Sequence, residues 1–251
     1  MKWHLNQLTT LFLMGFCVPI SGHAVMMCEH LTVTGHPSYP PISEAQGSTL
    51  VGLAPDLMSA VASKMGVEVS IKNYGDWELA QTATQRGEAD IIFGIYKNNE
   101  RETWLDYMGS PFMMDLVSIA VRKGQSFAFS DWADLKGHKG VTNAGESYGD
   151  RFDAFMASDL TVTHIHGVDK AFAFLVDGSA DYLIIGLYPG QREVALLGLE
   201  NQVDFLPQEV ASFGLYVGFS KASKCGDMKT QFADVLGQLI EAHNTVDAPN
   251  S

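Results

Sequence analysis

The sequence predicts an α/β protein that folds as two lobes, and three observations lead to this expectation. Predicted strands and helices alternate along the chain, which is typical of parallel sheets with right-handed crossovers. The segment Arg86–Gly94, "RGEADIIFG", resembles Asp177–Gly186, "DGSADYLIIG", as two lobes of one build would, although a chance match of two helix-to-strand junctions explains it equally well. Without the first 24 residues, which predict a signal peptide, 251 − 24 = 227 residues remain, enough for one large domain or for two small lobes of roughly 100 to 150 residues each.

The first residues predict an exported protein. Lys2 precedes the apolar run Leu8–Ile20, and Gly22 and Ala24 are small residues at a cleavage site, which together indicate a signal peptide over residues 1–24. The run is shorter than the about 20 apolar residues of a membrane span, and no later segment of that kind occurs. We therefore expect a soluble periplasmic protein that begins near Val25, with no lipid anchor.

Composition excludes some classes of partner. Lys and Arg number 16 against 29 Asp and Glu, and the resulting net charge of −13 repels phosphate backbones and anionic membrane surfaces. Neither a Walker loop nor a dinucleotide fingerprint is present. We expect no nucleic-acid partner and no cofactor.

The first half of the chain predicts strands and helices in alternation. His30–Gly35 has the pattern of a strand, Leu50–Gly66 that of a helix, and Val67–Gly75 that of a second strand. Asp76 is a candidate N-cap for the next helix. The segment "ADIIFG", Ala89–Gly94, is apolar enough for a strand that is buried on both faces.

The second half predicts a chain that leaves one lobe, builds another and returns. Leu116–Gly124 is a predicted strand, and Asp131–Ala157 predicts a short helix, a strand, a glycine turn and a helix. Ala211–Lys221 predicts a returning strand, with a helix over Asp227–His243 behind it. Two crossing segments place a ligand in the cleft between the lobes, outside the strand ends.

The turn Gly145–Gly149, "GESYG", has the form of the nucleophile elbow of α/β-hydrolases, which makes Ser147 a formal nucleophile. The preceding "KGVTNA" is too polar for the central strand of such a sheet, and no glycine-rich oxyanion segment lies upstream. We favour an alternative in which amides at a helix N-terminus, with the Ser147 hydroxyl, bind an anion without chemistry.

His164 and His166 would lie on one face of a strand, at a spacing that metals tolerate. No carboxylate or thiol stands at a matching spacing, so we favour a polar strand face and expect no metal site. Cys28 and Cys225 would remain after removal of the signal peptide. In an oxidising compartment they form a disulfide or stay as two buried thiols, and their spacing favours neither.

From about His30 to His243 the sequence resembles the bacterial periplasmic substrate-binding proteins of the polar amino-acid type, the class II extracellular solute-binding proteins. The resemblance is carried by the order and spacing of "SYPPI", "LVGLAPDLMSAVASKMGVEV", "DWELAQTATQRGEADIIFGIYKNNERETWLDYMGSPF" and "DLKGHKGVTNAGESYGDRF". It implies the two-lobed periplasmic binding protein fold, with parallel-type sheets, helices on both faces and two hinge crossings. It further implies a first lobe over residues 25–115 plus 210–251 and a second over 116–209.

The resemblance also implies a ligand site. The arginine that matches Arg101 holds the ligand's carboxylate by paired hydrogen bonds, which suits the flat fork of a guanidinium. Tyr39 and Trp77 match aromatic walls of the ligand pocket. The remaining candidates are the positions after the strand, Gly94 and Tyr96, and the residues of the opposite lobe, Glu146, Ser147, Tyr148 and Tyr188.

Two departures from the family pattern put a standard α-amino acid in doubt. His36 stands where the family has an acidic residue, and Gly186 stands where an aspartate usually holds the ligand's ammonium group. Glu146 is a possible replacement for that acid. We expect organic acids or modified amino acids to outcompete plain ones. The family's chain path also implies that Cys28 and Cys225 lie in the first lobe and can pair.

Three functions fit this resemblance. The first is capture of a small carboxylate-bearing solute by a monomeric protein for an ABC-type transporter, without catalysis. The second is a periplasmic enzyme of the dehydratase type on the same scaffold, with Glu146 or His36 as acid or base. The third is a ligand sensor that signals to a receptor. Fold alone does not separate them.

Overall fold

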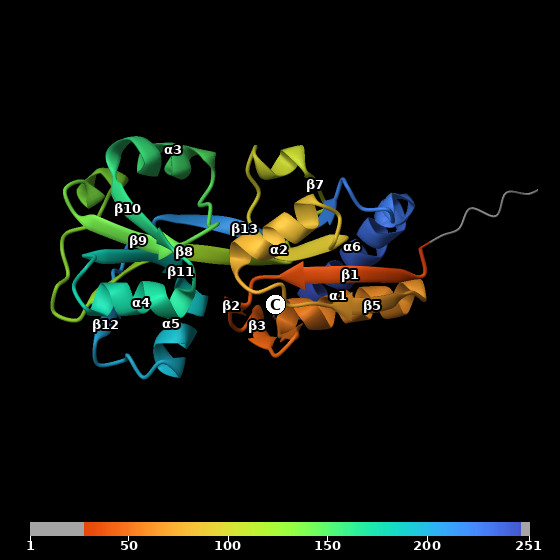
Figure 1. The fold of residues 1–251 in the computed structure, drawn as a ribbon, viewed down its shortest axis with the longest axis horizontal. Helices are drawn as coiled ribbons and strands as arrows, with labels where there is room; N and C mark the ends of the chain where they lie inside the picture. The colour runs from red at the N-terminus through yellow and green to blue at the C-terminus, as the bar shows by residue number, and fades with distance from the viewer. Residues whose placement is uncertain (1–27, 247–251) are drawn as a thin grey trace, which may run out of the picture.

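The computed structural model describes residues 28–246, which form two α/β lobes side by side, joined by two long strands (Figure 1). The predicted signal peptide lies outside the described residues. The joining strands are β8 (Met113–Arg122) and β13 (Ala211–Ser220), which pair with each other in antiparallel fashion. β13 also pairs with β6 of the first lobe, and β8 with β11 of the second, so one sheet continues through both lobes in the order β10-β9-β11-β8-β13-β6-β1-β5.

The first lobe combines sheet strands with three helices and a small separate sheet. Its strands in the main sheet are β1 (His30–Gly35), β5 (Glu68–Ile71), β6 (Ile91–Ile95) and β7 (Leu105–Tyr107). Its helices are α1 (Leu53–Met65), α2 (Trp77–Gln85) and α6 (Lys229–Val246), with 3₁₀ turns η1 (Arg101–Thr103) and η3 (Gly226–Met228). The small sheet contains β2 (Ser38–Tyr39), β3 (Ser43–Gln46) and β4 (Thr49–Val51).

The second lobe repeats this build on the other side of the crossing strands (Figure 1). Its strands are β9 (Lys139–Asn143), β10 (Thr161–Ile165), β11 (Tyr182–Gly186) and β12 (Val203–Phe205). Its helices are α3 (Asp150–Asp159), α4 (Val168–Val176) and α5 (Leu187–Leu196), with the 3₁₀ turn η2 (Trp132–Leu135). We propose residues 25–115 plus 210–251 for the first lobe and residues 116–209 for the second.

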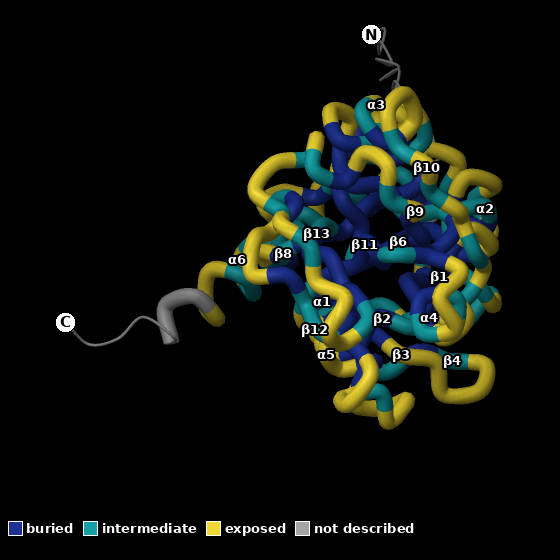
Figure 2. The backbone as a smooth tube through the Cα atoms, turned by 90° about the vertical axis from the view of Figure 1, so that its left-hand side faces the viewer, coloured by how far each residue is buried: buried dark blue, intermediate teal, exposed yellow. Residues whose placement is uncertain are grey.

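Alternating side chains of the inner strands enter two different cores, as the run "ADIIFG" predicts. In β6, Ile91 and Phe93 pack into the core shared with α1 and α6, whereas Ile92 and Ile95 pack with Trp77 of α2. Helices therefore cover both faces of the sheet. Figure 2 shows the result, with the inner strands buried and the outer sides of helices and loops exposed.

Local signals in the sequence mark several boundaries correctly. The Asp76 side chain accepts a hydrogen bond from the Leu79 amide and caps α2, as predicted. Gly66 ends α1 in the left-handed conformation. The helix predicted from Leu50 begins only at Leu53, because residues 49–51 pair with β3 instead. Between strand and helix, Gly52 has a φ of +127°, and a Cβ there would lie 2.8 Å from two backbone carbonyl oxygens.

One expectation about the sheet needs correction. The sheet is mixed, because β8 and β13 run antiparallel to the strands beside them, β11 and β6. The strand predicted in "KGVTNA" is present as β9, which lies between β10 and β11, and its last four residues are buried. Small residues and hydroxyls that bond within the core permit this, as when the Tyr148 hydroxyl meets that of Thr142 at 2.6 Å.

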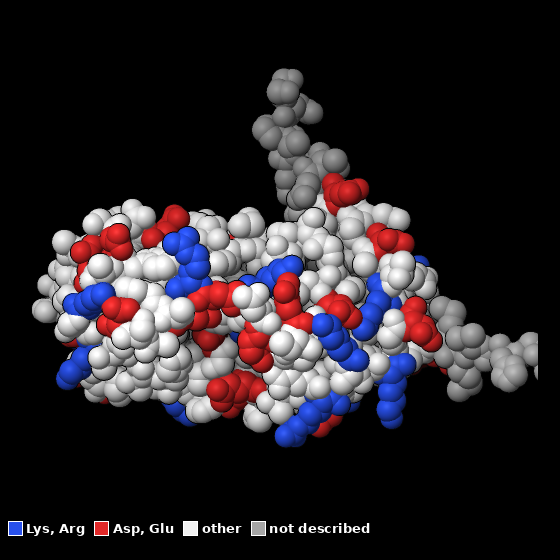
Figure 3. Space-filling view, turned by 90° about the horizontal axis from the view of Figure 1, so that it is seen from above, with Lys and Arg blue, Asp and Glu red and all other residues white. Residues whose placement is uncertain are grey.

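Cys28 and Cys225 form a disulfide, with their Cα atoms 5.4 Å apart. It joins the segment before β1 to the turn before η3, both in the first lobe. Within the described part of the chain, no helix combines the length and apolar character that crossing a bilayer requires. The face shown in Figure 3 carries acidic and basic side chains interspersed, without a continuous basic patch.

Candidate functional site

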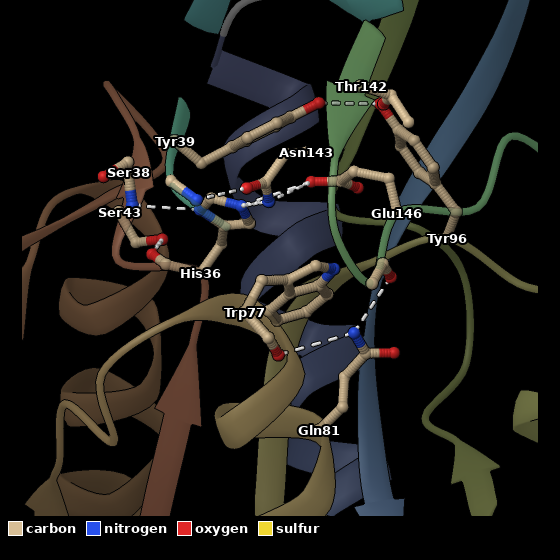
Figure 4. Close-up of polar contacts among 12 residues, drawn as sticks. His36, Ser38, Tyr39, Ser43, Trp77, Gln81, Tyr96, Thr142, Asn143 and Glu146 are labelled. Atoms are coloured by element: carbon tan, nitrogen blue, oxygen red, sulfur yellow. Dashed lines mark hydrogen bonds and ion pairs between the residues drawn. The ribbon is translucent and has the colours of Figure 1, made fainter. Parts of the chain in front are cut away.

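His36 and Glu146 connect the two lobes at the centre of the cleft (Figure 4). His36 follows β1, and its Nε2 lies 3.2 Å from Oε1 of Glu146, which follows β9. The Ser38 amide donates to His36 Nδ1 at 2.9 Å. A neutral imidazole has only one acceptor nitrogen, so Nε2 carries the hydrogen and donates to Glu146. Asn143 Nδ2 lies 3.4 Å from the same carboxylate oxygen.

Arg101 lies where the two lobes meet, and it is 2% exposed. Its Nη1 donates to the carbonyl of Tyr96 at 2.9 Å, and its Nη2 donates to the carbonyl of Gly145, in the other lobe, at 3.0 Å. The Asn98 side chain accepts from the Arg101 amide and fixes the start of η1. Burial lowers the pKa of the guanidinium, and the nearby Glu146 carboxylate opposes this change. Arg101 is therefore a buried cation bonded to two carbonyls, with further donors unused by them.

Trp77 has the unpartnered donor of the site. The side chain begins α2 and is 2% exposed, and its indole Nε1 has no hydrogen-bond partner among the described residues. Its ring lies 5.2 Å from that of His36 and 5.9 Å from the Arg101 guanidinium. In Figure 4 the indole nitrogen points away from His36, towards the side where Tyr96 and Glu146 lie. A buried donor without a partner costs stability, so this geometry suits an acceptor brought by a ligand.

Asp115 of β8 meets two tyrosines of the first lobe. Its Oδ2 lies at a hydrogen-bond distance of 2.5 Å from the hydroxyls of both Tyr39 and Tyr96, and these hydroxyls lie 2.8 Å apart. Burial raises the pKa of the Asp115 carboxyl, against the lowering effect of both tyrosine hydroxyls. Burial also raises the pKa of each tyrosine. Tyr39 thus stands at the centre of the site, where it also packs 5.3 Å from the His36 ring.

The turn 145–149 closes against the first lobe, and two of its amides already have acceptors within the second lobe. The Glu146 amide donates to the Asn143 carbonyl at 3.3 Å, and the Tyr148 amide donates to Asp153 Oδ1 at 2.7 Å. Ser147 donates to the other oxygen of Asp153 and accepts from Asn98 Nδ2 at 2.7 Å. The Asp153 carboxylate therefore already occupies the N-terminus of α3, where the sequence predicts an anion from outside.

The hydrolase alternative finds no support in this geometry. The partners of the Ser147 hydroxyl are a carboxylate and an amide, and its hydrogen bonds include no imidazole. His164 is exposed on β10, as expected for a polar strand face, whereas His166, also exposed, follows the end of that strand at Ile165. His166 contacts Asp76 and Glu78 of the first lobe at 3.4 and 3.5 Å. Among residues 28–246, no group of three His, Cys, Asp or Glu side chains has the geometry of a metal site.

Three predicted site residues lie outside this centre. Tyr148 is buried in the second lobe, where its hydroxyl donates to the Ile184 carbonyl at 2.8 Å. Tyr188 is 48% exposed on α5. Gly94 has a φ of +69°, which explains a glycine there, and it packs near Ile42. Tyr148 does line a small enclosed cavity of about 10 Å³ with Tyr39, Glu146 and Gly186.

An open groove leads to the site between α2 and the turn of the second lobe. It has a volume of about 520 Å³ and is lined by Glu78, Gln81, Thr82, Gln85, Asn98, Glu100, Arg101, Gly145, Glu146 and Ser147. Gln81 Nε2 donates to the Gly145 carbonyl at 3.0 Å, so the two sides of the groove are in contact. The described conformation is therefore a closed one, in which the protein's own side chains fill the centre.

Sequence reasoning missed Asp115, Asn98 and Asp153. A signal for Asp115 was present, because it is the one charge within the otherwise apolar "FMMDLVSIAV". A lone carboxylate in a buried strand needs a partner. Asn98 contacts Ser147 of the other lobe, and Asp153 bonds the turn before its own helix. The sequence pattern does not predict either contact.

Comparisons with known proteins agree with this architecture. The pattern of the bacterial extracellular solute-binding proteins, family 3, matches residues 31–245. The chain belongs to this family. Members of family 3 are binding proteins, and the predicted two-lobed fold is confirmed.

Solved structures share the fold at low sequence identity. An ancestral arginine-binding protein bound to glutamine is 22% identical with a TM-score of 0.72, and the match covers 86% of this chain and 93% of that one. A histidine kinase sensor domain with similarity to periplasmic binding proteins has a TM-score of 0.73 at 21% identity, and the match covers 87% of this chain and 93% of that one. The arginine-bound form of a Gly52Ala mutant of ArgBP from T. maritima, numbered as in that protein, has a TM-score of 0.71 at 20% identity. The match covers 84% of this chain and 96% of that one.

A curated protein also matches part of the sequence. The endonuclease MutS2 of Bacillus cytotoxicus is 29% identical over 150 residues, which cover 54% of this chain. The chain spans only 18% of that protein's length. This partial match contributes nothing to the function proposed below.

Proposed function

We propose that this family 3 protein captures a small solute with a carboxylate group between its lobes, in the periplasm, after export by the signal peptide of residues 1–24. Arg101 supports this most directly. Its buried guanidinium bonds one carbonyl of its own lobe and one, Gly145, of the other. A carboxylate that enters the open cleft can replace the Gly145 carbonyl and accept the paired bonds that a guanidinium offers.

The surroundings of Arg101 fit the same ligand. Trp77 offers an unpaired N–H beside it, and the rings of Trp77 and Tyr39 flank His36. Glu146, Ser147 and the groove residues of α2 face each other across the cleft. Closure around a solute by hinge motion in β8 and β13 requires no bond chemistry.

We further propose an amino acid or related organic acid as solute, and an ABC-type transporter as the partner of a monomeric protein. Relatives in fold include arginine-binding proteins and the substrate-binding protein of an amino acid ABC transporter. The likeness to a histidine kinase sensor domain keeps a signalling role as the second candidate. A permease gene beside this one would favour transport, and a sensor-kinase gene would favour signalling.

The experiment is a thermal-shift screen of the purified protein against amino acids, organic acids, amines and peptides. Each ligand found is then tested on Arg101→Ala and on Arg192→Ala, which removes an exposed arginine of α5. We expect Arg101→Ala to lose binding of every ligand and Arg192→Ala to keep it. X-ray scattering should show a closed ligand-bound wild type, with a radius of gyration no larger than that of the closed ligand-free protein. Parental affinity in Arg101→Ala, or a larger radius of gyration with a tight ligand bound, refutes the proposal.

The dehydratase alternative rests on the buried pair of His36 and Glu146, which has the residue types of an acid and a base. The two classes differ in the fate of the ligand. Retention of one ligand per protein molecule, recovered unchanged after denaturation, supports binding, whereas continuing loss of the acid at low protein concentration supports an enzyme.

A further inference from the structure

The oxygens of Tyr39, Tyr96 and Asp115 form a closed triangle at the junction of the lobes. Two sides, from Asp115 Oδ2 to each hydroxyl, measure 2.5 Å, and the third, between the hydroxyls, measures 2.8 Å. Asp115 is 2% exposed. All three contacts are of hydrogen-bond length, so each requires a proton between its two oxygens.

The number of protons decides the charge of this triangle. Each tyrosine hydroxyl has one proton to donate, and an ionised carboxylate has none. If Asp115 is ionised, the two tyrosine protons are the only ones available for the three oxygen–oxygen contacts. One pair of oxygens then lies in contact with lone pairs facing each other and no proton between them. A neutral Asp115 supplies the third proton, and each oxygen then donates once and accepts once.

The charges around Asp115 lead to the same conclusion. Glu146 is the charged neighbour that faces it from the second lobe, together with the buried Tyr148, and Glu146 raises the pKa of Asp115 further. None of the ion pairs among the described residues involves Asp115. Arg101 is bonded to the opposite end of Tyr96, at its carbonyl. A buried carboxylate without a cation is costly, so it either keeps a proton or acquires a cation.

Gly186 provides the space for this arrangement. A Cβ at Gly186 would lie 2.2 Å from the Tyr39 hydroxyl and 2.6 Å from Asp115 Oδ2. No other residue type fits there without displacing the triangle. The enclosed cavity beside Tyr39 and Gly186, about 10 Å³, holds at most one water. Gly186 of the second lobe covers the triangle, so a ligand group reaches Asp115 only when the lobes open and the two tyrosine side chains turn away from the carboxyl group.

We propose that Asp115 is the acidic specificity residue of the site: neutral in the ligand-free closed form, it gives up its proton when a cationic group of the ligand, such as an ammonium, takes that place. The inference deepens the proposed function and rests on it for the carboxylate end of the ligand. Tyr96 links the two ends, since its carbonyl accepts from Arg101 and its hydroxyl contacts Asp115. The ligand class is then a small acid that also carries an amine or guanidine.

The first test needs no ligand. Infrared difference spectroscopy at neutral pH compares wild type with Asp115→Asn, whose amide has nearly the same shape and still accepts from the tyrosines. We expect a protonated-carboxyl band in wild type that is absent from the variant and still present in Glu193→Gln, which removes a different buried acid of the second lobe. Carbon-13 NMR of labelled aspartate in wild type gives the same answer without any variant. An Asp115 carboxyl that is ionised at neutral pH overturns the proton assignment.

The second test uses arginine, agmatine, which lacks the carboxylate, and 5-guanidinopentanoate, which lacks the α-ammonium, with the twenty standard amino acids and their deaminated analogues. For amine-bearing binders we expect release of one proton per ligand in calorimetry with two buffers, and a loss of at least tenfold in affinity in Asp115→Asn. Acids without a cation should bind the variant as well as wild type. Unchanged affinity of an amine-bearing ligand for Asp115→Asn overturns the inference. Failure of every probe to bind wild type counts against the proposed function, while the spectroscopy still decides the state of Asp115.

Discussion

His36 and Glu146 form a buried contact across the two lobes, with Nε2 3.2 Å from Oε1 and side chains that are 5% and 11% exposed. The imidazole is neutral, because its other nitrogen accepts from the Ser38 amide. The pair therefore closes the cleft by a hydrogen bond to a carboxylate, without the presence of a ligand. The lobes meet through protein contacts that a solute has to replace.

Gly145 allows this close approach, and we predict that Gly145→Ala holds the cleft open. A Cβ at Gly145 would lie 2.7 Å from Glu78 Cγ and 2.9 Å from Gln81 Nε2, both on α2 of the first lobe. The added methyl group should therefore separate the lobes. X-ray scattering of the ligand-free variant should give a larger radius of gyration than wild type, with weaker ligand binding.

Gly137→Ala is the matched control for Gly145→Ala. Gly137 has a φ of +84° against +82° for Gly145, so both substitutions carry the same backbone strain, about 1 to 2 kcal/mol. Nothing lies within 4 Å of a Cβ at Gly137. Equal changes in radius of gyration for the two variants would show that strain, and not contact between the lobes, causes the effect.

The sequence predicts the local structure well, but it predicts poorly the contacts between residues far apart in the chain. Asp76 precedes a helix and predicts its N-cap, and the apolar β6 predicts burial on both faces, because these properties depend on near neighbours. Asp115 meets Tyr39, which lies 76 positions away along the chain, and only the complete fold brings them together. The Gly145 turn predicts amide donors, yet its carbonyl is the group that faces Arg101, because the local turn already uses two amides.

Trp77→Phe tests whether the unpartnered indole donor serves a ligand. Loss of the indole contacts destabilises the ligand-free protein, but removal of a buried unpaired N–H offsets this by about 1 to 3 kcal/mol. We expect little change in melting temperature and a loss of affinity of roughly 10- to 100-fold, the value of a hydrogen bond to a charged acceptor. Calorimetry with a ligand from the screen measures it.

Trp132→Phe provides the comparison for this experiment. The Trp132 indole of the second lobe already has an acceptor, the Val210 carbonyl at 2.9 Å. Its loss leaves that carbonyl unpaired, so the melting temperature should fall while affinity stays at the wild-type level. An affinity loss of equal size in both variants would contradict a ligand contact at Trp77.

The raised pKa of Asp115 predicts how stability depends on pH. A carboxyl whose pKa is raised by folding stabilises the folded state below its unfolded pKa of about 3.9, and this contribution is lost as pH rises through the folded pKa. Asp115→Asn has no such dependence. Its stability relative to wild type should therefore increase with pH above about 4, by at most about 1.4 kcal/mol per pH unit. Urea unfolding of both proteins from pH 4 to 8 measures the difference, and a difference that is constant over this range would contradict it.

The disulfide between Cys28 and Cys225 predicts a large effect of reduction. It connects positions 197 residues apart, so it restricts almost the whole unfolded chain. Its loss in Cys28→Ser with Cys225→Ser should lower the free energy of unfolding by roughly 2 to 4 kcal/mol. Of the three cysteines in the sequence, Cys17 lies in the predicted signal peptide, so the exported protein should contain no other thiol. Thiol titration of denatured, unreduced protein should then find no reactive group, and two after reduction. Two reactive thiols before reduction would show that the bond does not form in the exported protein.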